Sequence, residues 1–315
     1  MKKISIVIPI YNEEVAIEKN VRLVLKALDD NYRDAELVLV NDGSTDSTLD
    51  TIQRLAEGDK RIEVVSYGKN RGRGYALKRG FKQAVGDYII TTESDLNWGS
   101  DIIFRFAEEL DNDEADIIVA SPHMKGGKMI SVPFFRWFLS YMGNKVFALT
   151  MPQVMTMSTG MTRGYKREVL DVLDLESEGK ELHVEILNKA FDLGFYVKEI
   201  PATLNWERKN PSITMRKSHF KLGMILNHLL LSIIVRPFLL FGGVGFLMIG
   251  LGTIGGIYLL ILSITGTPVS GRPLLLFSSV MVLVGLQILL FGFLSCQIRG
   301  ICRQLLRIQK DIRKK

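Results

Sequence analysis

Two long stretches of this chain contain no charged residue, and they limit the folds that it can adopt. The first runs from Pro237 to Gly271 and the second from Pro273 to Ile298. A helix needs about 20 apolar residues to cross a bilayer, whereas a core helix of similar length carries a polar face. We therefore predict a hairpin of two transmembrane helices over residues 237–298, following a separate domain.

Positive charges are concentrated at the two outer ends of the predicted hairpin and not in the linker between its helices. The linker at residues 265–273 holds only Arg272, whereas residues 216–236 and 299–315 are rich in lysine and arginine. Cytoplasmic segments carry such an excess, so we predict an integral membrane protein with its larger domain and both termini in the cytoplasm. The net charge of +6 then requires no nucleic acid as a partner, because much of it can meet anionic lipid headgroups.

The first 120 residues alternate short β-rich runs with helical patterns. The predicted strands span residues 4–10, 36–40, 62–67, 88–92 and 116–120, and the predicted helices span residues 14–28, 47–56, 74–85 and 101–110. Such alternation predicts an α/β domain with a parallel sheet and helices on both faces. We expect this domain to cover residues 1–215. Its ligands should bind beyond the carboxyl ends of the strands.

Three segments outside the predicted sheet have amphipathic character. Residues 133–150 hold bulky apolar side chains with Arg136, Trp137 and Tyr141, which suits a helix in the membrane interface; a core helix is the alternative. Residues 216–236 are similar. The basic segment 299–315 has apolar residues at helical spacing and is expected to form a cytoplasmic helix against lipid or a partner subunit. The oligomeric state stays open, a homo-oligomer included.

Polar residues follow the first and second predicted strands where each one ends. The first strand leads into Pro9, Tyr11 and Glu13, a proline-stiffened exit with an aromatic ring and a carboxylate. The second ends in Asp42 and Gly43, and the glycine permits a sharp turn. Each exit by itself is an ordinary strand-to-helix turn.

The fourth predicted strand ends in an acidic segment, ESDLN. Alternation along an extended chain would place Glu93, Asp95 and Asn97 on one side. Carboxylate and amide oxygens are the ligands of Mg²⁺ or Mn²⁺, which would share its other positions with water and phosphate. A solvated acidic turn is the alternative for this motif taken alone.

The three exits should meet at one edge of the sheet, and together they suit a nucleoside diphosphate. The chain has no GxxxxGK[ST] loop and no GxGxxG after the first strand, and the GxG in NRGRG is a weak signal. Phosphoryl transfer by a P-loop and hydride transfer by a dinucleotide fold are both disfavoured.

The series IVIPIYNEE, VNDGSTDST, NRGRGYALKRG and ESD resembles glycosyltransferase family 2, whose members are inverting enzymes with a GT-A fold. Within that family the chain is similar to the polyprenyl-phosphate sugar synthases. The resemblance implies a nucleotide-sugar donor, GDP-mannose or a UDP-hexose, and a dolichyl or undecaprenyl phosphate acceptor. It also implies catalysis with Mg²⁺ or Mn²⁺.

The resemblance assigns roles to the residues at the strand exits. It implies that Pro9, Tyr11, Glu13 and Asp42 hold the nucleobase and ribose, that Asp95 is a metal ligand, and that Glu93 stands where the family usually has aspartate. Asn97 stands where the synthases usually have glutamine. The longer Glu93 can still reach the metal or a phosphate.

The resemblance also implies a set of residues for phosphate and lipid. Arg136, Ser140 and Asn144 match an RxxxSxxxN pattern whose arginine meets the lipid phosphate, and they fall on one face of a helix. Arg163 in GMTRGYKRE is a candidate for phosphate contact. Arg208 in NWERKNPS lies near a further arginine of the synthases, although a proline replaces the glycine of that motif.

Two rival functions remain open at the level of sequence. A family member acting on a hydroxyl of a lipid-linked glycan or glycolipid would need a base, and Glu181, His183 and Glu185 are its candidates; an ordinary helix surface is the alternative reading of that segment. The QxxRW motif of processive synthases is missing. A membrane protein that only binds a nucleotide sugar is the minor alternative, kept open by Glu93.

Overall fold

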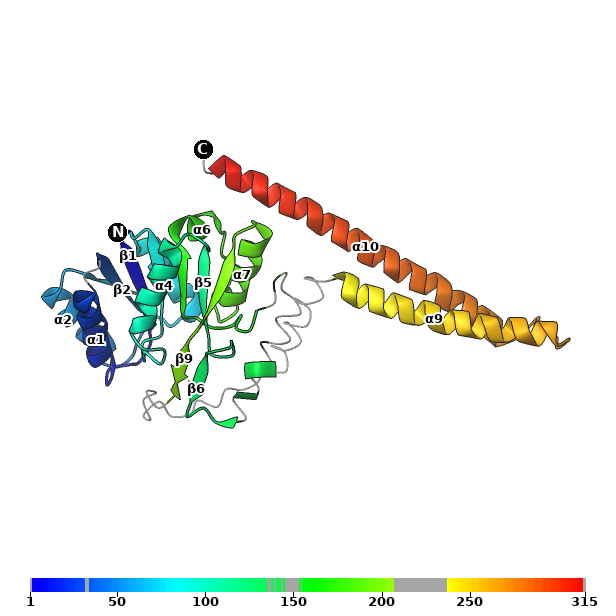
Figure 1. Cartoon of the computed structure of the whole chain (residues 1–315), viewed down its shortest axis with the longest axis horizontal. Coiled ribbons are helices and arrows are strands. Elements are labelled where there is room, and N and C mark those ends of the chain that lie inside the picture. Colours follow the sequence, from blue (N-terminus) through cyan, green and yellow to red (C-terminus); the bar gives the residue numbers. More distant parts are fainter. Residues whose placement is uncertain are drawn as a thin grey trace. The chain divides into compact units, whose positions relative to one another are not determined.

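The computed structural model describes residues 2–31, 34–134, 137–138, 140–142, 144, 153, 155–206 and 237–313. The chain divides into two compact units, Met1–Ser218 with Ile312–Lys315, and His219–Asp311. The first unit holds an α/β fold and the second holds two long helices (Figure 1).

A seven-stranded mixed sheet forms the centre of the first unit. In spatial order its strands are β3 (Ile62–Ser66), β2 (Ala35–Asn41), β1 (Ile4–Ile10), β4 (Tyr88–Thr91), β7 (Arg163–Lys166), β5 (Ile117–Ser121) and β8 (Val197–Pro201). Strands β6 (Lys128–Ile130) and β9 (Thr203–Asn205) pair separately. Because β1, β2 and β4 run parallel, their carboxyl ends lie at one edge of the sheet.

Helices cover both faces of the sheet, as predicted. They are α1 (Ile17–Asp30), α2 (Thr48–Gly58), α3 (Arg73–Gln83), α4 (Asp101–Asp111), α6 (Arg167–Val172) and α7 (Leu182–Asp192). The apolar face of α1 packs in one core with alternate residues of β1, such as Ile6 and Ile8. On the opposite face, Gly80 of α3 lies directly on Val7 and Val40, where a side chain would collide with both valines.

The five predicted strands run parallel, but the sheet also contains a strand that was not predicted, β7, which runs antiparallel to both β4 and β5. Its four residues, RGYK, include two charges and a glycine, so they lack the apolar run that marks a buried parallel strand. A Cβ at Gly164 would lie 3.0 Å from the Cβ of Phe106. The glycine therefore lets α4 pack closely over β7.

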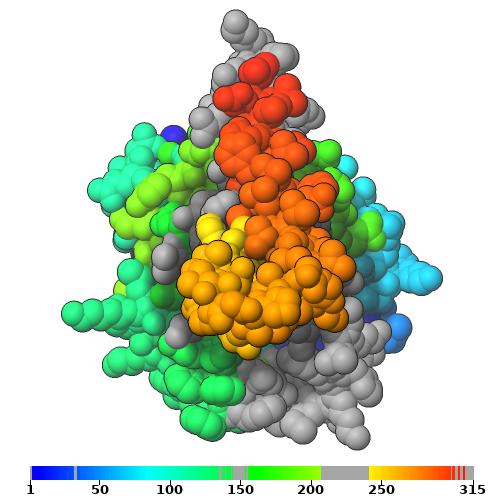
Figure 2. Space-filling model, turned by 90° about the vertical axis from the view of Figure 1, so that its right-hand side faces the viewer, coloured from blue at the N-terminus to red at the C-terminus, as the bar shows by residue number. Residues whose placement is uncertain are grey.

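The second unit contains α9 (Pro237–Ile264) and all but the last two residues of α10 (Pro273–Arg313), and the two helices lie side by side in Figure 2. The segments Phe241–Ile264 and Pro273–Ile298 are long and apolar enough to cross a membrane, with mean hydropathies of 2.2 and 2.5. A Cβ at Gly252 would lie 2.8 Å from the carbonyl oxygen of Ser278. Small residues thus permit close helix packing, which is common between membrane helices.

Two predicted helices next to the hairpin have different outcomes. The predicted basic helix at residues 299–315 is not a separate element, because α10 continues without a break to Arg313. The predicted interface helix at residues 216–236 lies outside the described residues.

Candidate functional site

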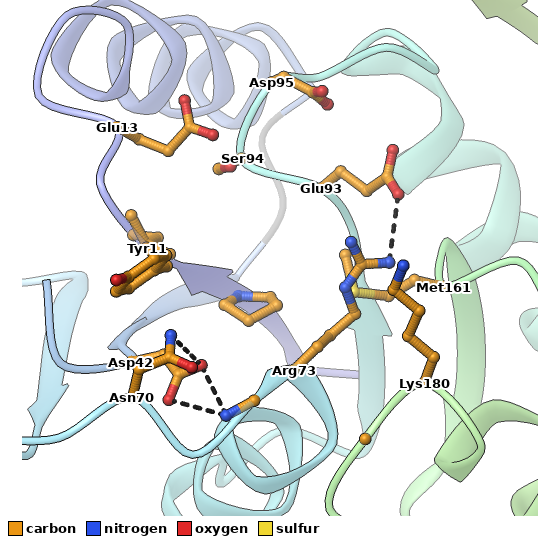
Figure 3. Close-up of a pocket in the computed structure, with 14 residues that line it drawn as sticks. Tyr11, Glu13, Asp42, Asn70, Arg73, Glu93, Ser94, Asp95, Met161 and Lys180 are labelled. Carbon is orange, nitrogen blue, oxygen red and sulfur yellow. Dashed lines mark hydrogen bonds and ion pairs between the residues drawn. The ribbon is translucent and has the colours of Figure 1, made fainter. Parts of the chain in front are cut away.

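The exits of β1, β2 and β4 line one open cavity of about 460 Å³ (Figure 3). All five residues predicted for the nucleotide, which are Pro9, Tyr11, Glu13, Asp42 and Glu93, line this cavity together with Asp95. Three acidic side chains, Glu13, Glu93 and Asp95, lie along one part of its wall in Figure 3. The structure therefore brings the predicted donor residues together.

The exits of β1 and β2 are tied to each other by hydrogen bonds around Asn12. This residue has a positive φ of 54°, a conformation that asparagine tolerates better than most residues. Its Oδ1 accepts a hydrogen bond from the backbone N–H of Thr45 at 2.8 Å. The N–H of Glu13 donates to Oγ1 of Thr48 at 2.8 Å. Tyr11 and Glu13 are thereby held at the rim of the cavity.

Asp42 is almost fully buried and organises the loop before α3. Its carboxylate accepts hydrogen bonds from the Tyr67 hydroxyl at 2.9 Å and from Nδ2 of Asn70 at 3.1 Å. It also accepts from the N–H groups of Arg71 at 2.8 Å and Gly72 at 3.0 Å. Burial and the neighbouring Asp42 carboxylate both raise the pKa of the Tyr67 phenol, so Tyr67 stays a donor.

The acidic segment after β4 is a turn and not the extended chain that the alternation argument assumed. The strand ends at Thr91, the N–H of Leu96 donates to the carbonyl of Glu93 at 3.1 Å, and Leu96 has a φ of 47°. Glu93 and Asp95 still line the cavity, but Asn97 does not. The turn, and not strand alternation, brings the two carboxylates to the same site.

Glu93 and Asp95 bring two carboxylates to the cavity, and carboxylates are the ligand type that a divalent cation takes. Within the described part of the chain, no group of three or more histidine, cysteine, aspartate or glutamate side chains could hold a metal ion by itself. Two carboxylates are the hard oxygen donors that Mg²⁺ or Mn²⁺ takes. Asn97, also predicted as a metal ligand, instead orients Asp95: its Nδ2 donates a hydrogen bond to Asp95 Oδ2 at 2.7 Å.

Two cationic residues of the cavity were missed in the sequence. Arg73 begins α3 and Lys180 precedes α7, and both line the cavity. Their elements are docked: the N–H of Tyr75 donates to the carbonyl of Glu178 at 2.9 Å. A Cβ at Gly74 would lie 2.5 Å from the carbonyl oxygen of Gly179. Arg73 lies in the NRGRGYALKRG motif of the family resemblance, but the sequence analysis assigned it no role.

Arg163, the predicted phosphate contact, lies away from the cavity. Its side chain is fully buried and does not line the cavity. The guanidinium donates to the backbone carbonyls of His183 at 2.7 Å and Ser158 at 2.6 Å. Burial lowers the pKa of this guanidinium. Arg163 thus ties β7 to the start of α7 and to the loop before β7.

The residues predicted for the acceptor lipid are only partly described. Arg136 and Arg208 lie outside the described residues. Asn144 is buried, and its Oδ1 accepts from the N–H of Ser158 at 3.0 Å, while Ser140 Oγ lies 3.3 Å from Nε2 of His123. Asn144 therefore has a structural contact of its own.

The segment that contains Ser140 and Asn144 also carries aromatic rings on the surface. Phe134 stacks on Trp137, which stacks on Tyr141 with ring centroids 5.6 Å apart. All three rings are exposed, as the predicted interface segment requires.

The three candidates for a general base are engaged elsewhere or buried. Glu185 accepts hydrogen bonds from the N–H groups of Glu176 and Ser177, both at 2.9 Å, and from Lys189 at 2.7 Å. Although burial alone would raise it, these bonds lower the pKa of Glu185 to about 2. His183 is buried, which lowers its pKa well below the usual value. Glu181 accepts from the N–H of Gly179. None of them lines the cavity.

Fold and site define an α/β ligand-binding domain, with a partly acidic cavity at its strand exits, joined to an apolar helical hairpin. Residues 5–174 match the model of glycosyl transferase family 2. The chain therefore belongs to glycosyl transferase family 2.

Two relatives extend the comparison beyond the family domain. The chain is 30% identical to the dolichol-phosphate mannosyltransferase of Pyrococcus furiosus over 224 residues, which cover 70% of this chain and 61% of the relative. It is 26% identical to the undecaprenyl-phosphate 4-deoxy-4-formamido-L-arabinose transferase of Klebsiella pneumoniae over 298 residues, covering 94% of this chain and 88% of the relative. Both relatives are named for sugar transfer that involves a polyprenyl phosphate.

A solved structure shares the fold of the first unit. It is the glucosyl-3-phosphoglycerate synthase of Mycobacterium tuberculosis in complex with Mn²⁺, UDP-glucose and phosphoglyceric acid. The match has a TM-score of 0.51 and 23% identity, and it covers 65% of this chain and 70% of that one. At this identity the likeness shows the fold alone, a GT-A-type arrangement.

Proposed function

We propose that this protein transfers a hexose from a nucleotide sugar to the phosphate of a polyprenyl carrier lipid at the cytoplasmic face of a membrane. The observation that carries the proposal is the distribution of charge in the cavity. Carboxylates for a metal-bound diphosphate line the same cavity as the cationic residues Arg73 and Lys180, and none of the candidate bases lines it. The names of the two relatives support the same reaction.

The donor is proposed to bind with its nucleoside at Pro9, Tyr11, Glu13 and Asp42 and its diphosphate near Glu93 and Asp95. A divalent cation held by the two last residues would supply charge neutralisation for the departing diphosphate. The ring of Tyr11 offers a stacking surface at the rim. The nucleobase and the sugar are left to experiment, with GDP-mannose and UDP-hexoses as the candidate donors.

The reaction is proposed to be a single in-line displacement. A lipid phosphate oxygen forms a bond to the anomeric carbon, the bond from that carbon to the diphosphate oxygen breaks, and the nucleoside diphosphate leaves with the electron pair. A phosphomonoester has a second pKa of about 6 and is largely dianionic at neutral pH. Such a nucleophile needs no proton acceptor, but it needs cations to bring two anions together.

The engaged state of Glu185 favours a phosphate acceptor over a hydroxyl acceptor. A hydroxyl must lose a proton during attack, and Glu185 with its pKa of about 2 is a poor proton acceptor. For the lipid phosphate we propose Arg136 and Arg208 as contacts, with Ser140 and Asn144 shaping the segment that carries Arg136. The positive flanks of the hairpin support cytoplasmic termini.

A donor panel with the purified protein tests the proposal. GDP-mannose and several UDP-hexoses would be offered with either a short polyprenyl phosphate or the matching polyprenol, in Mn²⁺, Mg²⁺ or EDTA. We expect a sugar–phosphate–lipid product from the phosphate alone, and no product in EDTA. Transfer to the polyprenol with no transfer to the phosphate would refute the assignment of the acceptor.

A further inference from the structure

Arg73 and Glu93 form an ion pair in the wall of the cavity. Nη1 of Arg73 lies 3.7 Å from Oε1 of Glu93, and the two side chains keep 40% and 27% of their surface exposed. Figure 3 shows the guanidinium directed at this carboxylate and not at Asp42. Glu93 is one of the two carboxylates that fit a divalent cation. The same oxygen is therefore available to two positive partners.

The backbone around Arg73 sets its position. The first turn of α3 docks on the loop at residues 178–180, through the hydrogen bond from Tyr75 N–H to the Glu178 carbonyl. The missing side chain of Gly74 allows the backbones to touch. These contacts fix the backbone and not the Arg73 side chain, which is 40% exposed.

A second arginine near the amino end of α3, Arg71, interacts with other groups and not with Glu93. Nη2 of Arg71 lies 2.9 Å from Oε1 of Glu178, and its guanidinium lies 3.8 Å from the ring centroid of Tyr75. Arg71 does not line the cavity. Arg71 therefore carries the same charge near the same place without competing for Glu93.

We propose that Arg73 is the resident counter-ion of Glu93 and that a divalent cation must displace it in order to bind. In the metal-free protein the guanidinium neutralises Glu93 and keeps this carboxylate in the cavity. When a cation takes the carboxylate, the freed guanidinium turns to the anionic diphosphate. This last step rests on the proposed function, whereas the competition itself requires only the two residues and a cation.

Mn²⁺ binding to the full chain in detergent, without donor or acceptor, tests the competition. Free Mn²⁺ would be measured by its electron paramagnetic resonance signal. We expect Arg73→Gln to bind Mn²⁺ about three- to fivefold more tightly than the parent, a modest change because partly exposed ion pairs are weak. Arg73→Lys should stay near the parent value. In Glu93→Gln the added Arg73→Gln change should have no effect.

Arg71→Gln is the matched control, because it removes one positive charge from the same helix end. It should leave Mn²⁺ affinity within about 1.5-fold of the parent, since Coulomb interactions at longer range are screened. An unchanged or weaker affinity in Arg73→Gln would overturn the proposal. So would equal tightening in both variants, or no measurable Mn²⁺ binding in either parent or Arg73→Gln. Sugar transfer to polyprenyl phosphate, assayed separately, reports on the proposed function alone.

Discussion

The carboxylate of Asp42, at the end of β2, accepts a hydrogen bond from the N–H of Gly72 at 3.0 Å and so closes the amino end of α3. An anion at this end of a helix is favourable, because the first N–H groups lack partners within the helix. This hydrogen bond joins Asp42, which is proposed to hold the nucleoside, to α3, the helix that begins with Arg73.

Replacing Asp42 is expected to affect both stability and donor binding. In Asp42→Asn one oxygen acceptor becomes an NH₂ group that faces N–H donors, and hydrogen bonds to charged groups contribute about 1.5–3 kcal/mol. We expect a lower melting temperature and about tenfold weaker nucleoside diphosphate binding, equivalent to about 1.4 kcal/mol. Calorimetry checks both. Asp50→Asn, on the exposed surface of the first turn of α2, should leave donor binding unchanged and lower the stability by at most about 1 kcal/mol; equal losses in both variants would contradict the assignment.

Loss of the Asp95 carboxylate should abolish most transfer. Asp95→Asn is expected to slow turnover by about 10²–10³-fold, by analogy with the loss of other groups that stabilise developing charge. Glu93→Asp restores the residue usual in the family, so it should retain turnover within a few-fold. Initial rates over a range of Mn²⁺ concentrations measure both effects. Near-parental rates for Asp95→Asn would remove this residue from the mechanism.

Glu185 predicts a pH dependence of stability and not of turnover. Its folded pKa of about 2 lies below the usual 4.5. The stability that it contributes is therefore present above about pH 4.5 and is lost as the pH falls towards 2. In this window the melting temperature of Glu185→Gln should change less with pH than that of the parent. At pH 7 the variant should keep turnover on polyprenyl phosphate within a few-fold. Loss of turnover in a folded variant would instead favour a base.

Arg163 is expected to behave as a structural residue. Arg163→Lys keeps the charge but cannot reach both the His183 and Ser158 carbonyls. An unsatisfied buried group costs about 1–3 kcal/mol, so the melting temperature should fall clearly. Donor affinity of the folded fraction should stay within about threefold, because the side chain does not line the cavity. Weakened donor binding at an unchanged melting temperature would restore the phosphate role.

The hairpin should not tolerate bulk at Gly252. In Gly252→Leu the new side chain would meet the Ser278 carbonyl oxygen and the Val282 side chain, and overpacking of this kind costs about 1–3 kcal/mol. Thermal unfolding in detergent should show the loss. Gly250→Leu is the control, since a Cβ there meets nothing within 4 Å. Equal behaviour of the two variants would speak against close packing at this point.

The strand–helix order and the meeting of Tyr11, Asp42 and Asp95 were open to prediction because they depend on local signals. Buried β-rich runs mark the strands, and the carboxyl ends of parallel strands share an edge. The apolar hairpin follows from length and composition alone. The segment after β4 is a turn and not the extended chain that was expected, but Glu93 and Asp95 still line the expected cavity.

Only the tertiary structure decided what depends on contacts between distant segments. Nothing in RGYK indicates a strand inserted antiparallel between β4 and β5, and so the burial of Arg163 could not be foreseen. Arg73 and Lys180 share a cavity because α3 docks on the loop at residues 178–180, and that docking depends on the missing side chain of Gly74. A sequence pattern records which side chains are present, but their partners are set by how the backbones pack.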